Sequence, residues 1–363
     1  MKYEILARKW RPQSFSEIVG QKYIVRALKN SISSLRIHQS WIFYGSRGTG
    51  KTSLARILTK SLNCKFIKTG NPCKICSSCM EIQKGNFIDL IEIDAASRTR
   101  IEDIKEILEN MQYSPSKGIY KVYLIDEVHM LSNHSFNALL KILEEPPKHV
   151  KFILATTIIK KVPDTIISRC LCFNLKKINK KEIYQHLKKV LRHEKIEYEK
   201  NGLKIISDKA EGSIRDALSI VEQTISMGNE KIFTADVLNI FGMLKKKNII
   251  SIIKNIFLKK TEKLFQCIKK IDSLNVDWEE LLNEMIILVH HIAIIKNFNN
   301  SKKNFMHMNT ENQKKIEEIS NYCHIDKIQL YYKILIIGKK ELKLAPNPKI
   351  GIEMIFFRLL DLN

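Results

Sequence analysis

The 363-residue sequence predicts an α/β fold with a parallel sheet in its N-terminal half, followed by two all-helical segments. Short apolar runs of the buried-strand type alternate with helical patterns as far as Leu175, which is typical of a parallel sheet covered on both faces. Beyond the basic stretch 176–181, helical periodicity continues without a convincing strand. We therefore predict three domains, at 1–177, 178–242 and 243–363.

The elements of the sheet domain are expected to follow one another as strand and helix units. A helical stretch precedes the first strand, which ends in a glycine-rich turn at Gly45. Further strands are predicted where apolar residues alternate or run together, at 87–93, 120–125, 150–155 and 171–175, with helices at 51–62 and 132–145. The carboxyl ends of such strands meet at one edge of the sheet, where these folds bind ligands.

The composition is that of a globular chain with excess positive charge. Hydrophobic residues make up 44% of the sequence, and 61 Lys and Arg against 38 Asp and Glu leave a formal charge of +23. This balance favours a polyanion such as nucleic acid as a partner. Because the excess is spread along the chain as Lys-Lys pairs, a general coding bias explains much of it.

Neither a signal peptide nor a membrane span is expected. Charged residues interrupt the first dozen positions. The longest uncharged apolar run, Met285 to Ile295, is shorter than the roughly 20 residues that a spanning helix needs. Eight cysteines, four of them clustered, do not resemble the disulfide framework of a secreted protein. The sequence therefore predicts a reducing, cytoplasmic setting.

The turn between the first strand and the helix at 51–62 predicts a phosphate-binding loop. Its glycines allow successive N–H groups to point at phosphate oxygens, and the positive end of the helix dipole faces the same anion. Lys51 is placed to reach the β and γ phosphates, and Thr52 to put its hydroxyl on Mg²⁺. An ordinary glycine turn is the alternative. The predicted nucleotide-binding residues are Gly45, Ser46, Arg47, Gly48, Thr49, Gly50, Lys51 and Thr52.

Four cysteines after this helix have the spacing C-x8-C-x2-C-x2-C. Cys64, Cys73, Cys76 and Cys79 lie within sixteen residues and can close a tetrahedral zinc site. Four thiolates leave no open position for a substrate, so the metal would be structural. An iron–sulfur cluster is an alternative, although its fourth cysteine usually follows three residues after the third. Unliganded cysteines are the other alternative.

Acidic and hydroxyl side chains follow two of the predicted strands. The strand 120–125 ends in Asp126 and Glu127, and the next strand along the chain ends in Thr156 and Thr157. Asp126 would hold Mg²⁺, and Glu127 would polarise the attacking water. The hydroxyl of Thr157 could sense the γ phosphate or orient that water. A surface turn is the alternative for the two carboxylates.

Three arginines and two further cysteines are less specific. Arg98 and Arg100 lead from a strand into a helix and are candidates for phosphate contact, with a solvated helix start as the alternative. Arg215 lies near a helix N-terminus, where a cation opposes the dipole, which indicates that it serves something outside the helix. Cys170 and Cys172 share a strand face by the period of two and are predicted to lie in the core.

Several motifs together resemble one family. They are A-R-K-W-R-P at 7–12, the phosphate loop, the four cysteines, E-I-D-A-A-S at 92–97, L-I-D-E-V-H-M-L at 124–131, L-L-K-I-L-E-E-P-P at 139–147, S-R-C at 168–170 and G-S-I-R-D at 212–216. This combination closely resembles the gamma/tau subunit family of bacterial DNA polymerase III, in its short gamma-like form. The resemblance spans essentially the whole chain and is densest up to Leu175.

The resemblance implies an AAA+ ATPase domain with an inserted zinc module at 64–79, a small helical lid domain and a helical collar domain for oligomerisation. It implies the ATPase motor of the sliding-clamp loader, with ATP, Mg²⁺ and Zn²⁺ as cofactors. The expected partners are the delta and delta-prime subunits, further copies of the chain, the clamp, primed DNA and, through the holoenzyme, the polymerase core. No polymerase active site is identified in the chain itself.

The resemblance also assigns roles to single residues. Arg169 would be an arginine finger that acts on ATP held by a neighbouring subunit, and Arg215 a sensor of the γ phosphate. Without the family, a structural salt bridge would be the default for both. Arg98, Arg100 and Lys141 would face duplex DNA and contact its backbone.

The sequence departs from the family in two places. Ile158 stands where an acidic residue is expected, although the preceding threonine is in place. A chain that ends at Asn363 is also expected not to couple leading and lagging strands as the longer tau form does.

Two rival functions remain open at this level. The run 126–129 also spells a D-E-x-H box, as in nucleic-acid helicases, but those enzymes need a second nucleotide-fold domain, and no second run of buried strands follows Leu175. The other rival is a scaffold that binds nucleotide without turnover. Lys51, Thr52 and both carboxylates are present, which argues against it.

Overall fold

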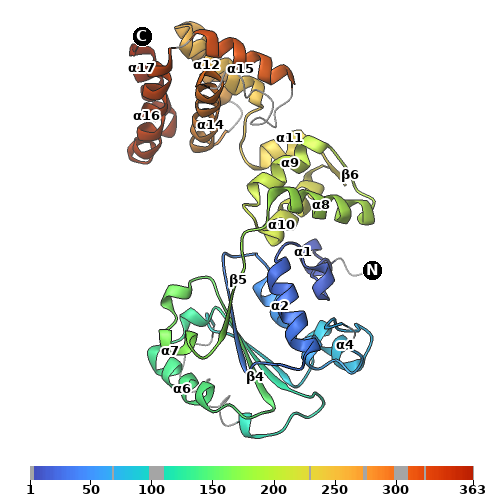
Figure 1. Ribbon diagram of the computed structural model, residues 1–363. Coiled ribbons are helices and arrows are strands. Elements are labelled where there is room, and N and C mark those ends of the chain that lie inside the picture. Colours follow the sequence, from blue (N-terminus) through green and yellow to red (C-terminus); the bar gives the residue numbers. More distant parts are fainter. Residues whose placement is uncertain are drawn as a thin grey trace. The chain divides into compact units, whose positions relative to one another are not determined.

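The computed structural model describes residues 4–67, 69–97, 110–228, 230–272, 276–297, 310–322 and 324–362. The chain divides into two compact units, Met1–Ile232 and Phe233–Asn363. The first unit contains the sheet, and the second consists of helices (Figure 1). The predicted boundaries at 177 and 242 stay a prediction. Arg98 and Arg100 lie outside the described residues.

The first unit is built on a five-stranded parallel sheet with the order β2-β3-β4-β1-β5. The strands are β1 (Ser40–Tyr44), β2 (Leu90–Asp94), β3 (Lys121–Asp126), β4 (Val150–Thr156) and β5 (Leu171–Asn174). In this register Tyr44 pairs with Thr156, and Asp94 with Asp126. The predicted α/β class is confirmed, and the strands end together at the edge where the polar side chains were expected.

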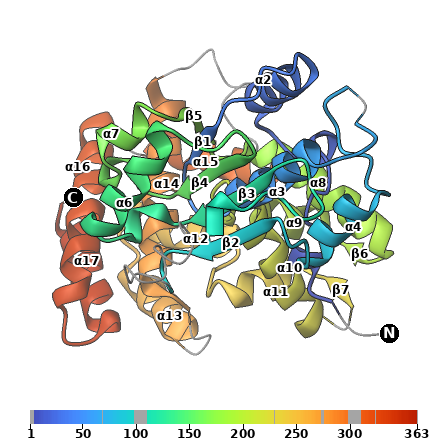
Figure 2. The same cartoon turned by 90° about the horizontal axis from the view of Figure 1, so that it is seen from below.

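Helices cover both faces of the sheet, and Figure 2 shows α3 and α6 on opposite sides of it. The helices of this unit are α1 (Leu6–Lys9), α2 (Lys22–Ser33), α3 (Lys51–Leu62), α4 (Ser77–Lys84), α6 (Asn133–Glu144), α7 (Asp164–Ile167), α8 (Lys180–Glu194), α9 (Lys200–Lys209) and α10 (Ile214–Met227). Trp41 and Phe43 pack with Leu54 of α3 in one core, and Ile42 packs with Phe136 of α6 in another. Both faces of each central strand are therefore apolar, which explains the uninterrupted apolar runs.

The helices α8 and α10 begin at side-chain caps. Asn179 accepts a hydrogen bond from the N–H of Lys181 at 3.0 Å, and Glu182 accepts one from the N–H of Asn179 at 3.4 Å. Ser213 caps α10 by accepting from the N–H of Asp216 at 3.1 Å. Side-chain oxygens at these positions satisfy N–H groups that the first helical turn leaves without partners.

Two sequence-based expectations about strands are wrong. The short strands β6 (Glu197–Tyr198) and β7 (Lys231–Ile232) pair in parallel after the predicted last strand. Two residues are too few to produce a detectable period. Cys172 is exposed because β5 is an edge strand that pairs with β1 alone among the described strands. Cys170 is half-buried and lies before β5.

The second unit is helical throughout its described residues, as predicted. Its helices are α11 (Thr234–Ile240), α12 (Lys246–Phe257), α13 (Thr261–Asp272), α14 (Trp278–Asn297), α15 (Thr310–Tyr322), α16 (Ile325–Glu341) and α17 (Pro348–Asp361). Leu282, Met285 and Ile292 of α14 are buried in a core shared with the other helices. In the part of the chain that the structure describes, no helix is both long and apolar enough to cross a membrane.

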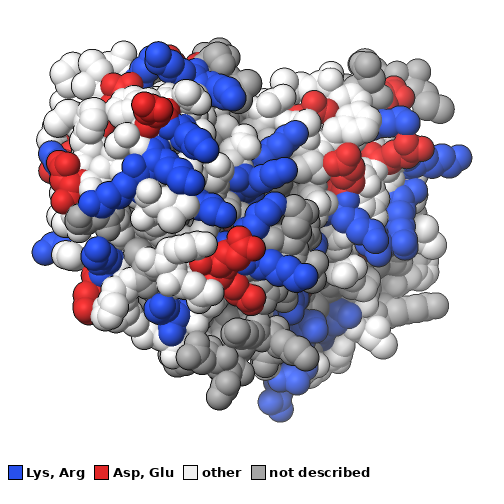
Figure 3. All heavy atoms as spheres, turned by 90° about the horizontal axis from the view of Figure 1, so that it is seen from above, with Lys and Arg blue, Asp and Glu red and all other residues white. Residues whose placement is uncertain are grey.

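Positive charge is spread over the face of the molecule that Figure 3 shows. On the face seen in Figure 3, Lys and Arg side chains are spread widely, with fewer Asp and Glu between them. This spread agrees with the sequence, in which lysine pairs recur along the chain.

Candidate nucleotide-binding site

The glycine-rich loop lies between β1 and α3, and its conformation requires glycine. Gly45 has φ +148°, and a Cβ there would lie 2.3 Å from the carbonyl oxygen of Leu175. Gly48 has φ +74°, and a Cβ there would lie 1.8 Å from Ser213 Oγ. Left-handed backbone of this kind is costly for residues with a side chain. The loop therefore packs closely against the end of β5 and against the start of α10.

Lys51 lies buried over this loop. Its Nζ donates hydrogen bonds to the carbonyl oxygens of Gly45 at 3.0 Å and Ser46 at 3.1 Å. Burial lowers the pKa of Lys51, while the nearby carboxylates of Glu127 and Asp126 oppose that effect. Such a cation, held by carbonyl groups that a phosphate could replace, is suited to an anionic ligand.

The loop's other predicted ligands differ in their exposure. Thr49 is buried, and its hydroxyl donates to the carbonyl oxygen of Ser46 at 2.8 Å. Arg47 is exposed. The side chain of Thr49 thus shapes the loop, whereas that of Arg47 faces solvent.

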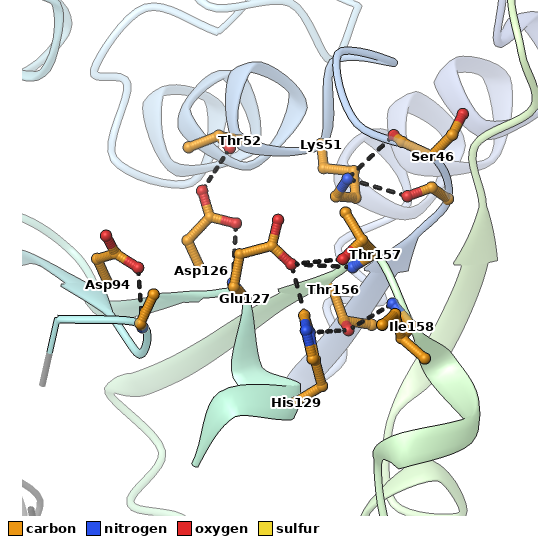
Figure 4. A network of polar contacts seen from close by, with 12 residues as sticks. Ser46, Lys51, Thr52, Asp94, Asp126, Glu127, His129, Thr156, Thr157 and Ile158 are labelled. Atoms are coloured by element: carbon orange, nitrogen blue, oxygen red, sulfur yellow. Dashed lines mark hydrogen bonds and ion pairs between the residues drawn. The ribbon is translucent and has the colours of Figure 1, made fainter. Parts of the chain in front are cut away.

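The two predicted magnesium ligands are in direct contact. Thr52 Oγ1, in the first turn of α3, donates a hydrogen bond to Asp126 Oδ2 at the end of β3, at 2.7 Å (Figure 4). Asp126 Oδ1 accepts from the N–H of Glu127 at 3.0 Å. A hydroxyl and a carboxylate at this spacing are the oxygen ligands that Mg²⁺ prefers beside phosphates. The donor set fits the metal.

Glu127 is held at the same edge of the sheet by Thr157 and by a histidine. Its Oε2 accepts hydrogen bonds from the hydroxyl of Thr157 at 2.9 Å and from the N–H of Thr157 at 3.1 Å. His129 Nδ1 lies 3.3 Å from this Oε2 and 2.9 Å from Thr156 Oγ1. The sequence predicted that Glu127 and Thr157 lie at the same edge of the sheet, but no role was predicted for His129. The histidine in the run 124–131 was the available signal.

Besides Lys51, a second cationic side chain lies near α3, that of Arg11, for which no role was predicted from the sequence. Arg11 Nε donates to Ser53 Oγ at 3.2 Å. Burial and the positive charges of Arg56 and Arg215, partly offset by nearby carboxylates, lower the pKa of Arg11 to about 10. Arg215 itself is exposed in the first turn of α10. The structure thus brings Arg215 close enough to influence a side chain bound to α3.

Arg169 and Lys141 lie elsewhere on the first unit. Arg169 follows α7, and its guanidinium donates to Glu144 Oε1 and to the carbonyl oxygen of Thr165, each at 2.7 Å. The Arg169 side chain is 35% exposed. Lys141 is exposed on α6. Their roles as arginine finger and DNA contact stay predictions.

The four clustered cysteines come together beyond the C-terminal end of α3. One Sγ from each of Cys64, Cys73, Cys76 and Cys79 lies within 4.8 Å of the other three. The N–H groups of Cys73 and Cys76 donate to Cys64 Sγ and Cys73 Sγ, both at 3.3 Å. Zn–S bonds of about 2.3 Å in a tetrahedron place sulfurs roughly 4 Å apart, so these sulfurs fit a zinc ion.

The thiols of the cluster differ in their pKa values. Burial raises the pKa of Cys64 and of Cys79, which favours their neutral form while no metal is bound. Burial acts to raise the pKa of Cys73, but backbone N–H groups of Cys76 and Ile75 and the neighbouring thiols outweigh it and lower the pKa to about 6. The thiolate is the form that binds metal.

Comparison with solved structures shows the fold. Structures of RuvB from Thermotoga maritima, described as a Holliday junction branch migration motor, superpose with a TM-score of 0.50 at 19% sequence identity. The superposition covers 68% of this chain and 79% of that chain. Together with the sheet order, this likeness defines the parallel-sheet α/β fold of the AAA+ class.

Sequence relatives then define the family. Residues 20–179 match the family model described as DNA polymerase III, delta subunit, residues 182–230 match the clamp loader subunit ATPase lid domain, and residues 232–363 match subunits gamma and tau domain III. The DNA polymerase III subunit gamma of Buchnera aphidicola subsp. Baizongia pistaciae is 50% identical over 363 residues, covering 100% of this chain and 98% of that protein. Subunit tau of Escherichia coli is 46% identical over 360 residues, covering 99% of this chain and 56% of tau. The chain therefore belongs to the gamma/tau family of DNA polymerase III clamp-loader subunits.

The main functional prediction is thereby confirmed. The chain is a clamp-loader ATPase subunit of DNA polymerase III, and DNA replication is the process it serves. The helicase alternative finds no support in these relatives.

Proposed function

We propose that this chain binds Mg²⁺–ATP at its phosphate loop and hydrolyses it to load a sliding clamp onto primed DNA. The observation that carries the proposal is the 2.7 Å contact between Thr52 and Asp126, with Glu127 at the end of the same strand. These side chains come from separate segments and converge where a triphosphate and its metal would lie. When bound, Mg²⁺ would neutralise charge on the phosphates, with Thr52 and Asp126 as its protein ligands.

Some of the chain's own residues would bind the phosphates, and others would orient the attacking water. Lys51 would exchange its two carbonyl partners for phosphate oxygens, a stronger charge-assisted interaction. Glu127 would orient the attacking water, and the Thr157 hydroxyl would donate a hydrogen bond to the γ phosphate. Arg215, at the start of α10, would transmit the state of the phosphate to the helices that follow it.

Hydrolysis would depend on assembly, because Arg169 would act on ATP held by a neighbouring protomer. Its guanidinium is already used within the chain, by Glu144 and Thr165. A partner's γ phosphate would compete with these neutralising contacts. The proposed assembly contains delta and delta-prime subunits and further copies of this chain, within a cytoplasmic DNA polymerase III holoenzyme whose polymerase core is a separate subunit.

The cysteine cluster would hold a structural zinc ion. Cys64, Cys73, Cys76 and Cys79 would supply all four ligands as thiolates, which leaves no position for a substrate. The proposed role is to fix the segment between α3 and β2.

Contact with primed DNA would be made to its backbone. Lys141 is exposed on α6 and is proposed to contact phosphates together with Arg98 and Arg100. Such contacts position a duplex without reading its sequence.

The test is the ATPase rate of the complex reconstituted from this chain, delta and delta-prime, measured with and without clamp and primed DNA. We expect clamp and primed DNA together to stimulate turnover. The Arg169→Ala variant should bind ATP normally and lose about 1000-fold in stimulated turnover. A rate that ignores clamp and primer would contradict the loader mechanism, and normal turnover by Arg169→Ala would remove the arginine finger.

A further inference from the structure

One oxygen of the Glu127 carboxylate accepts two hydrogen bonds, both from Thr157, and the other accepts none among the described residues. Oε2 accepts from the hydroxyl of Thr157 at 2.9 Å and from its N–H at 3.1 Å, and His129 Nδ1 lies 3.3 Å away. Figure 4 shows the other oxygen on the side of the carboxylate that faces Lys51. Anchoring Oε2 thus directs Oε1 toward the place where phosphate and water would lie.

Thr157 cannot serve both Glu127 and the nucleotide with its hydroxyl. A threonine hydroxyl has a single proton to donate. If Thr157 donates that proton to the γ phosphate, as the proposed function requires, its hydroxyl bond to Glu127 Oε2 is lost. The N–H of Thr157 and the ring of His129 then remain to hold Oε2.

The ring of His129 is itself held in place. Its side chain is 8% exposed, and Nδ1 lies 2.9 Å from Thr156 Oγ1. Thr156 Oγ1 also accepts from the N–H of Ile158 at 3.1 Å, and the carbonyl oxygen of Thr156 accepts from the N–H of Gly45 at 3.3 Å. The ring orientation is therefore tied to β4 and to the phosphate loop. A donor fixed in this way costs little entropy when it binds the carboxylate.

We propose that His129 is a positioning residue for Glu127. Nδ1 has one proton to donate, and Thr156 Oγ1 at 2.9 Å and Glu127 Oε2 at 3.3 Å both lie within its reach. After Thr157 has turned its hydroxyl to the nucleotide, His129 donates this proton to Oε2 instead of to Thr156 and keeps Oε1 directed at the attacking water. This inference rests on the proposed function, because it assumes that Glu127 orients water. It adds a prediction that the proposed function does not make, namely that loss of His129 slows turnover and leaves ATP binding intact.

The test uses three histidine variants in the reconstituted complex with clamp and primed DNA. His129→Leu keeps the bulk of the side chain and removes the donor. His129→Asn places an amide N–H where Nδ1 lies. His134→Leu, at an exposed position on α6, is the matched control. The measurements are kcat and KM for ATP, together with the ATP dissociation constant of the full chain.

We expect His129→Leu to lower kcat about 10-fold, as loss of one hydrogen bond to a charged group does, and to leave KM and ATP affinity within about twofold. His129→Asn should recover most of the lost rate, and His134→Leu should match the wild type. In a Glu127→Gln background, His129→Leu should cause no further loss. His129→Ala, which also removes the donor, carries the same expectation should His129→Leu not fold.

Three results would overturn the inference. They are a wild-type kcat for His129→Leu, a His129→Asn variant as slow as His129→Leu, and a full additional 10-fold loss in the Glu127→Gln background. If Glu127→Gln turns over like the wild type, the proposed role of Glu127 fails and this inference fails with it. An inactive Glu127→Gln beside a normal His129→Leu overturns this inference alone.

Discussion

Helix α3 (Lys51–Leu62) has a candidate site at each end, and the two sites are built in different ways. At its N-terminal end, Thr52 meets Asp126, which lies 74 positions away in the sequence. Beyond its C-terminal end, the cysteine cluster draws all four side chains from the stretch Cys64 to Cys79. The first site exists only when the sheet is formed, whereas the second is defined by local spacing. Substitutions in the nucleotide site should therefore mainly weaken ATP binding, and substitutions in the cysteine cluster should mainly lower the free energy of unfolding.

Removing one of the proposed zinc ligands should have the largest effect, and it should fall on stability. We expect Cys79→Ser to lose bound zinc and to lower the free energy of unfolding by about 4 kcal/mol, as loss of a structural metal does. ATP affinity should stay within about threefold, because the two ends of α3 bind independently. Zinc content and chemical denaturation check this. Cys267→Ser, in the second unit, is the control. Full zinc content in Cys79→Ser would show that the cluster is not a metal site.

Removing the loop lysine should have the next largest effect, and it should fall on function. We expect Lys51→Ala to weaken ATP binding about 100-fold, because a charge-assisted contact to phosphate is lost, and to retain zinc. Equilibrium dialysis with ATP measures this, with the exposed Lys22→Ala as control. Unchanged affinity in Lys51→Ala would exclude this loop as the nucleotide site.

A methyl group in the loop should have the smallest effect of the three. Gly48→Ala places a Cβ against Ser213 in addition to straining a left-handed backbone, and we expect it to destabilise the first unit by about 2 kcal/mol. Gly85 has a similar φ of +82° with no atom within 4 Å of its Cβ position, so Gly85→Ala measures the strain alone. Thermal unfolding of both variants gives the difference. Equal costs would mean that the loop does not pack closely against Ser213.

The sequence predicted the residues that local patterns define. Lys51 and Thr52 follow from the loop pattern, the proposed zinc ligands from cysteine spacing, and Asp126 from its place after a buried strand. The parallel sheet and the helical second unit were predicted in the same way and are confirmed.

The missed features depend on contacts between distant segments. His129 and Arg11 gained their partners from β4 and α3, and nothing in their own neighbourhoods indicated which atoms they would meet. Cys172 was expected in the core because period alone does not distinguish an edge strand from a central one.

We propose that ATP hydrolysis assisted by Glu127 drives clamp loading. The most direct test of this proposal is ATP-driven clamp loading and release by the complex assembled with Glu127→Gln, followed on primed DNA. The amide keeps the shape of the side chain but cannot act as a base. We predict that the variant complex binds ATP and the clamp, hydrolyses at least about 100-fold more slowly than the wild type and retains the clamp. Wild-type hydrolysis and release by Glu127→Gln would contradict the account.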